Sequence, residues 1–135
     1  MKSQENIINC LFESIDEYIK VDNPYESYIP LLKDDEKLYF IQEENRGSIK
    51  IGISKEPEER LKALQTGNSK KLRLLWMVNP KNRSVERNLH KIFNDDRLER
   101  EWFEPTELLL RVVLETICHC FDGCWFGSNS LIFND

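Results

Sequence analysis

The feature that most constrains this fold is a pair of strand-like segments, residues 37–43 and 48–54, separated by turn residues. In the second segment every other residue from 49 to 53 is isoleucine, which is the period of a strand with one buried face. Residues 44–47 read ENRG, which are turn residues, and Gly47 is free to adopt a positive φ there. A two-stranded hairpin is only marginally stable in water, so a third strand has to complete the sheet.

Residues 71–78 predict that third strand. Helices are expected over residues 57–64, 85–93 and 106–118, with Pro57, Ser84 and Thr106 at their starts. The second helix has an apolar stripe of Val85, Leu89, Ile92 and Phe93, which we expect to be buried. Gly67 is expected at a positive φ after the first helix. The predicted class is α+β: a small three-stranded antiparallel sheet flanked by helices in the order ββαβα plus a final helix.

The N-terminal region looks like an appendage to this domain. Residues 3–20 have apolar side chains at helical spacing, and residues 21–36 form a linker with two prolines. We therefore expect residues 1–36 to precede a domain of residues 37–118, with 119–135 as a tail packed on it. The apolar face of the helix either packs on the domain or serves as an interface for a second copy or a protein partner.

Composition predicts an intracellular, cytoplasmic protein, in the host cytoplasm if the protein is viral. Charged residues make up 32% of the chain, no apolar run approaches the roughly 20 residues of a membrane span, and the first residues do not form a secretory signal. Cys118, Cys120 and Cys124 are then expected to be thiols rather than disulfides. Their spacing around His119 is a poor zinc pattern, so a metal site there is the weaker alternative.

The charge distribution is compatible with a nucleic-acid partner, although the net charge is -5. Residues 60–100 carry eleven basic and four acidic side chains, which gives this segment +7. A local basic field attracts phosphates even when the average charge is negative. The alternative is that these cations only solvate two helices and a strand.

Several short pieces occur together in a specific order. They are Leu38-Tyr39-Phe40, Lys50-Ile51-Gly52-Ile53-Ser54, Arg60, Leu64-Gln65-Thr66-Gly67-Asn68, Glu86 with His90, and Glu101-Trp102-Phe103. Over about 70 to 80 residues this order resembles the GIY-YIG nuclease superfamily, and more narrowly its T5orf172 or Mug113-like branch, which is frequent in phages and large viruses. The resemblance implies a metal-dependent endonuclease of phage, viral or mobile-element type that hydrolyses DNA, with DNA favoured over RNA. The chain departs from the superfamily pattern at Leu38-Tyr39-Phe40, and at Lys50, where the name-giving motif has a tyrosine.

By this resemblance Tyr39 is the reactive tyrosine that orients or deprotonates the attacking water. A phenol needs a nearby cation for a base role, and Lys50 on the paired strand is expected to supply it. Arg60 is expected to bind the scissile phosphate. The residues alone leave open that Tyr39 is a core aromatic and that Arg60 is an exposed helix residue paired with Glu56.

Glu86 is expected to be the carboxylate ligand of a Mg²⁺ or Mn²⁺ ion, and His90, one turn later, to orient a metal-bound water or the 3′ leaving group. Glu86 is also an ordinary first-turn glutamate, and His90 an ordinary structural histidine. The expected backbone contacts to nucleic acid are Arg60, Lys62, Lys70, Lys71 and Arg87. Trp102 and Phe103 are expected to pack in the core. The alternative function is a weak or inactive module that keeps the fold and binds nucleic acid or a host protein.

Overall fold

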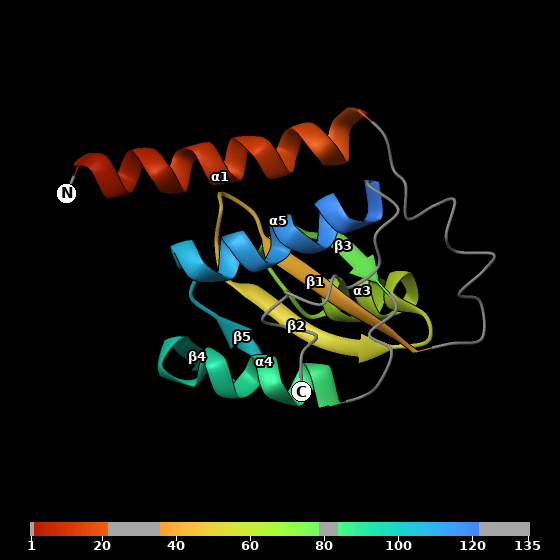
Figure 1. The fold of residues 1–135 in the computed structure, drawn as a ribbon. Helices are drawn as coiled ribbons and strands as arrows, with labels where there is room; N and C mark the ends of the chain where they lie inside the picture. Colours follow the sequence, from red (N-terminus) through yellow and green to blue (C-terminus); the bar gives the residue numbers. More distant parts are fainter. Residues whose placement is uncertain (1, 22–35, 79–83, 122–135) are drawn as a thin grey trace.

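The computed structural model describes residues 2–21, 36–78 and 84–121 (Figure 1). The elements are α1 (Lys2–Val21), β1 (Lys37–Glu43), β2 (Ile49–Ser54), α3 (Pro57–Thr66), β3 (Leu72–Val78), α4 (Ser84–Ile92), the 3-10 turn η1 (Asn94–Asp96), β4 (Arg97–Glu99), β5 (Trp102–Phe103) and α5 (Glu107–Phe121). The expected linker and most of the expected tail lie outside the described residues. So do the side chains of Cys118, Cys120 and Cys124.

The α+β class is confirmed, but the sheet is larger than expected. Its strand order is β3-β1-β2-β5-β4, and every neighbouring pair is antiparallel. The three expected strands form its centre and one edge. The prediction of three strands missed β4 and β5 because they span only three and two residues, which is too short for an alternating pattern to be visible.

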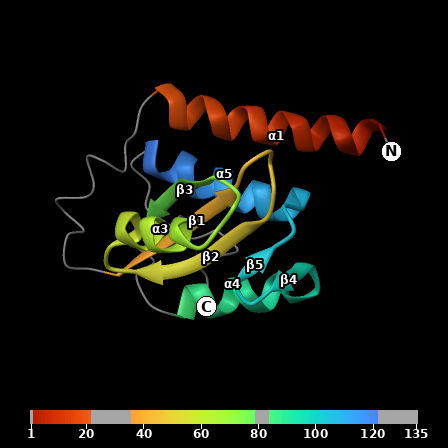
Figure 2. The same cartoon turned by 180° about the vertical axis from the view of Figure 1, so that it is seen from behind.

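Strand alternation divides the sheet's side chains between two apolar cores. Leu38 and Phe40 point into the larger core, which α5 covers on the face turned toward the viewer in Figure 1. Trp76 and Phe103 are fully buried there, and the burial of Phe103 was expected. The opposite face is covered by α3, seen in front of the sheet in Figure 2. Its smaller core contains Tyr39, Ile41, Leu72, Leu74 and Met77.

The predicted positive φ of Gly67 was wrong, and the hairpin turn does not use the conformational freedom of Gly47. The left-handed residues of the turn are the two before that glycine, Asn45 (φ 62) and Arg46 (φ 58). Gly67 has a φ of -101, because the Gln65 side chain stabilises the loop after α3 without a left-handed residue. The Gln65 amide donates to the Lys70 carbonyl at 2.9 Å, and its oxygen accepts from the Leu72 N–H at 2.8 Å.

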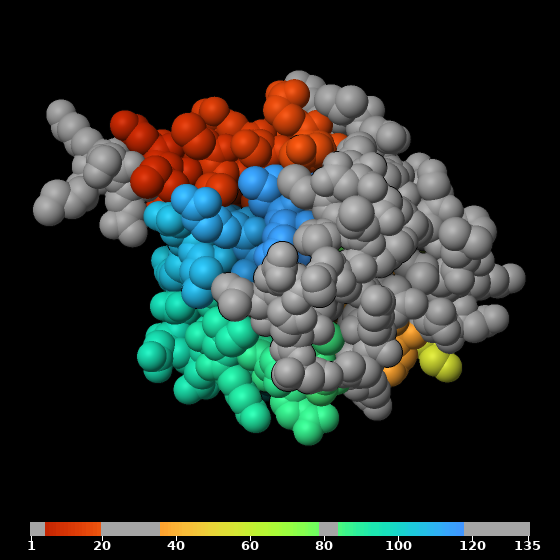
Figure 3. Space-filling model, in the orientation of Figure 1, coloured from red at the N-terminus to blue at the C-terminus, as the bar shows by residue number. Residues whose placement is uncertain are grey.

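The apolar face of α1 packs within the chain. Leu11, Phe12 and Ile15 are buried in the larger core, against α5. Figure 3 shows α1 lying along α5. Arg73 of β3 forms an ion pair with Asp16 at 2.8 Å, and Arg46 of the hairpin turn lies 4.9 Å from the centre of the Phe12 ring. These contacts support a structural role for this helix face rather than a free interface.

Helix α4 lies beside β2 at the lower edge of the sheet in Figure 1. Val85, Leu89 and Phe93 are buried as expected. Ile92 is 47% exposed, so its predicted burial was wrong. It is the last residue of α4 and lies at the rim of the apolar stripe, where the core ends.

Candidate active site

The site begins with the placement of Tyr39 over a glycine. Tyr39 of β1 and Gly52 of β2 are directly opposite in the hairpin register. A Cβ added to Gly52 would lie 2.5 Å from Cζ of Tyr39, well inside contact distance. Gly52 is therefore needed at this position because the tyrosine ring occupies the space above it. The ring is 2% exposed and is held on the face of the sheet that α3 covers.

Arg60 on α3 lies near the phenol of Tyr39, and its side chain is exposed. Burial raises the pKa of Tyr39 above its usual value of 10.0, and this outweighs the lowering effect of the nearby Arg60 guanidinium. The charges of Glu101 and Glu86 also raise the pKa of Tyr39. The phenol is consequently protonated at neutral pH.

Lys50 lies on the same sheet face as Tyr39 but has a different partner. Its Nζ is 2.7 Å from Oε1 of Glu101, with 6% of the lysine side chain exposed and 40% of the glutamate. A buried ammonium needs such a partner, because an unpaired charge would be costly at this depth. The cation that lowers the pKa of the Tyr39 phenol is Arg60, whereas the sequence led us to expect Lys50 in that position.

His90 attaches α4 to the edge of the sheet. Its Nε2–H donates to the Ile51 carbonyl at 2.9 Å, where β2 extends past its pairing with β5. The ring centre lies 5.4 Å from that of Phe103. In the neutral ring this hydrogen bond selects the Nε2–H tautomer, in which Nδ1 carries the lone pair. The other nitrogen of metal-bound histidines is usually fixed in this way.

His90 and two neighbouring carboxylates can together hold a cation. Within the described ranges, Glu86, His90 and Glu101 offer ligand atoms that all lie within 4.8 Å of one another, and all three residues are half-buried. Two carboxylates and an imidazole suit Mn²⁺ and, with waters completing the shell, Mg²⁺. The donor set therefore fits a divalent metal. The expected ligand Glu86 has two neighbours capable of sharing its role.

One family model matches this chain. Residues 36–121, more than half of the chain, match the T5orf172 domain. The chain belongs to the T5orf172 family. This family is related to the GIY-YIG group, as the order of motifs had indicated. The T5orf172 segment begins one residue before β1 and ends with α5, so α1 lies outside it. No curated protein and no solved structure matches the chain significantly.

Five predicted residues of this T5orf172 domain come together around the edge of β2. Tyr39, Lys50 and Arg60 approach from the sheet face under α3, and Glu86 and His90 approach from α4. The remaining predicted cations are exposed. Lys62 is paired with Glu59 at 3.4 Å and Lys70 with Glu43 at 3.8 Å, while Lys71 follows α3 and Arg87 lies on α4.

Glu101 is the member of the site that sequence reasoning missed. It was noticed only as the first residue of the Glu101-Trp102-Phe103 piece, whose aromatics were expected to pack. Trp102 does pack, half-buried, against the smaller core. The signal for Glu101 was indirect: a lysine in a strand, Lys50, whose buried charge required a carboxylate from elsewhere.

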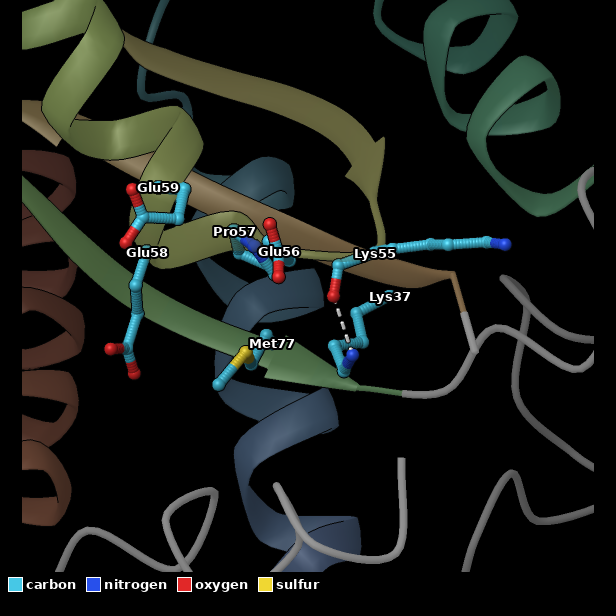
Figure 4. Close-up of a pocket in the computed structure, with 7 residues that line it drawn as sticks. All are labelled: Lys37, Lys55, Glu56, Pro57, Glu58, Glu59 and Met77. Carbon is cyan, nitrogen blue, oxygen red and sulfur yellow. Dashed lines mark hydrogen bonds between the residues drawn. The ribbon is translucent and has the colours of Figure 1, made fainter. Parts of the chain in front are cut away.

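A separate pocket of about 230 Å³ lies at the start of α3 (Figure 4). Lys37 extends into it and donates from Nζ to the Lys55 carbonyl at 2.6 Å. Glu56, Glu58 and Glu59 also line it. Three carboxylates in the lining disfavour a phosphate ligand, and the residues of the candidate site do not line it. No helix in the described part of the T5orf172 chain has the length and apolar character needed to cross a membrane.

Proposed function

We propose that this protein is a metal-dependent endonuclease that hydrolyses DNA phosphodiester bonds. The observation that carries the proposal is the meeting of two groups at one edge of the sheet. One is the neighbouring pair Tyr39 and Arg60, and the other is the possible cation ligands Glu86, His90 and Glu101. A phosphate-binding guanidinium, a hydroxyl and a hard-cation site are the groups that phosphodiester hydrolysis requires. Family membership supports the same reaction class.

Arg60 is proposed to bind the scissile phosphate. Its side chain is exposed and lies near the Tyr39 phenol, so its charge is available to a substrate phosphate at the site. A guanidinium stays charged and binds two phosphate oxygens at once, which stabilises the charge that builds up during attack. Losing one preorganised donor of this kind costs about 100- to 1,000-fold in rate.

Tyr39 is proposed to hold the attacking water. Hydrolysis joins the water oxygen to phosphorus, breaks the bond to the 3′ oxygen, and moves one proton from the water to the leaving group. Because its pKa is raised, the Tyr39 phenol acts first as a hydrogen-bonding group and not as a base. His90, fixed by the Ile51 carbonyl, keeps its free nitrogen directed to the same region.

Glu86, His90 and Glu101 are the residues proposed to hold Mg²⁺ or Mn²⁺. The ion would supply positive charge for the phosphate and the leaving oxygen. Occupancy would also offset the two carboxylates that raise the pKa of Tyr39. The contact of Glu101 with Lys50 orients its carboxylate toward this region while leaving a second oxygen for another partner.

The test is nicking of supercoiled plasmid in Mg²⁺ and in Mn²⁺. The variants are Arg60→Ala and Glu86→Gln, and Glu17→Gln is the matched control because it removes an exposed carboxylate on α1. We expect cleavage by the wild type and the control, a fall of about 100-fold or more in Arg60→Ala, and loss in Glu86→Gln. Absence of nicking by the folded wild type in both cations would refute the proposal, as would full activity of Glu86→Gln.

A second candidate function is a nucleic-acid-binding module without useful turnover. Two observations favour it: the ion pair that already occupies one oxygen of Glu101, and the protonated phenol of Tyr39. This alternative predicts DNA binding by the wild type that is insensitive to Mn²⁺, together with no nicking. Binding strengthened by Mn²⁺ and followed by cleavage would reject it.

A further inference from the structure

A basic pocket adjoins the candidate site on the outer side of α4. It has a volume of about 430 Å³ and is lined by Arg87, His90, Lys91, Asn94 and Arg97. The first four stand at positions i, i+3, i+4 and i+7, which places them on one face of the helix and its 3-10 extension. Arg97 comes from β4. Figure 3 shows the segment from α4 to β4 on the open lower edge of the molecule.

The Arg97 side chain is held in position. Its guanidinium lies 5.0 Å from the centre of the Phe103 ring, and its NH1 donates to the Arg100 carbonyl. Phe103 also contacts the ring of His90. Arg97 and His90 therefore lie against one buried aromatic ring, which connects the pocket to the candidate site. A guanidinium held by stacking loses less freedom when it binds an anion.

The pocket is suited to an anion. Among the described residues that line it, three are permanent cations, Arg87, Lys91 and Arg97, and there is no carboxylate. Asn94 adds an amide donor. Helix α4 thus presents two neighbouring stripes that meet at His90. Glu86 and His90 belong to the possible cation site, and Arg87 and Lys91 line the pocket. An anion in the pocket would lie beside a phosphate held at the site.

We propose that this pocket binds a backbone phosphate of the same nucleic acid, next to the phosphate that is cleaved. The proposal rests on the proposed function for the identity of the ligand, and it names the surface over which the strand passes. Lys91 and Arg97 join Arg87 as contacts, whereas Lys62 and Lys70 already pair with glutamates. The contact is independent of sequence, since phosphate oxygens are the same at every base.

The test measures the salt dependence of binding. A fluorescein-labelled 20-base-pair duplex is titrated by anisotropy in EDTA, over a series of NaCl concentrations, with the wild type and the double variant Arg87→Gln/Lys91→Gln. Each phosphate contact contributes about 0.9 to the slope of log K against log[salt], and the pocket is proposed to hold one phosphate, so the double variant should lose about 0.9. At 0.1 M salt this corresponds to roughly 8-fold weaker binding.

Two further variants make the result specific. Arg97→Gln removes a third cation from the same phosphate site and should also lower the slope, by up to about 0.9. Arg111→Gln makes the same charge change on α5, where Arg111 pairs with Glu107, and should keep the wild-type slope. A wild-type slope in the double variant, or no duplex binding by the wild type, would overturn the inference. An equal loss of slope in Arg111→Gln would also overturn the inference, because the effect would then come from the overall charge of the protein and not from the pocket.

The same variants separate this inference from the proposed function. Plasmid nicking with an unchanged slope in the double variant would reject the pocket and leave the nuclease intact. A slope lost in the double variant, with no nicking by the wild type, would support the pocket and reject the nuclease. Circular dichroism of each variant establishes that it is folded before binding is compared.

Discussion

Substitution of Gly52 by alanine is the most direct test of how the site is built. In the wild type the added Cβ would lie 2.5 Å from Cζ of Tyr39, so the ring has to move. That ring is 2% exposed and is packed among apolar side chains. Overpacking of this kind typically costs about 1 to 3 kcal/mol. We therefore expect Gly52→Ala to lower the free energy of unfolding by that amount in a urea titration.

The effect of Gly52→Ala on the free energy of unfolding should change sign when the Tyr39 ring is absent. In a Tyr39→Ala background the new methyl group meets no ring, and alanine is better than glycine in a strand by about 0.5 to 1 kcal/mol. Gly52→Ala should then be stabilising. The coupling free energy in the double-mutant cycle is the difference between the two effects, about 1.5 to 4 kcal/mol. A similar destabilisation in both backgrounds would contradict the reasoning, because its cause would lie outside the Tyr39 ring.

The same substitution should reduce activity beyond its effect on stability. Moving the ring displaces the phenol from Arg60, so plasmid nicking by folded Gly52→Ala should fall toward that of Tyr39→Phe. Nicking is measured at a temperature where circular dichroism shows both proteins to be folded. Full activity in Gly52→Ala would show that the position of the phenol does not matter for cleavage.

Three other predictions follow from the site. The folded state binds the Tyr39 proton more tightly than the unfolded chain, because burial raises the pKa of Tyr39 above 10. The contribution of the protonated Tyr39 phenol to the free energy of unfolding is therefore fully present below pH 10 and is lost as the pH rises further. Tyr39→Phe should abolish this loss in urea titrations from pH 8 to 11. Mn²⁺ at 100 times its Kd should stabilise the fold by about 2.7 kcal/mol, seen as a higher melting temperature, and an equal shift in Glu101→Gln would exclude that carboxylate as a ligand. Lys50→Met should tighten Mn²⁺ binding in calorimetry by removing a competing cation from Glu101, and weaker binding would show that the lysine orients the ligand instead.

Local patterns in the sequence predicted the residues of the site that lie on long elements. The alternation of β1 and β2 determines that Tyr39 and Lys50 share a face, and helical spacing places Glu86 and His90 together. Arg60 follows from its distance along the chain from Gly52. These are short-range relations, so spacing alone is enough to place them.

Contacts between distant segments could not be predicted in the same way. Glu101 reaches Lys50 only because β5, two residues long, pairs with the edge of β2. Arg97 is positioned by stacking on Phe103, which depends on the β4–β5 pairing. Whether Tyr39 pairs with Arg60 or Lys50 depends on side-chain burial and competing partners. None of these leaves a periodic pattern in the sequence.

The docking of α1 on α5 has a consequence for how the protein reaches its folded state. The two helices lie near opposite ends of the described chain, so their contact closes a long loop and involves the α5 segment, which is made late in synthesis. Until then Leu11, Phe12 and Ile15 have no apolar surface of α5 to cover them. Conversely, a chain shortened to the family segment would expose the α5 surface that α1 covers and would tend to self-associate. The larger apolar core thus includes residues outside the segment by which the family is recognised.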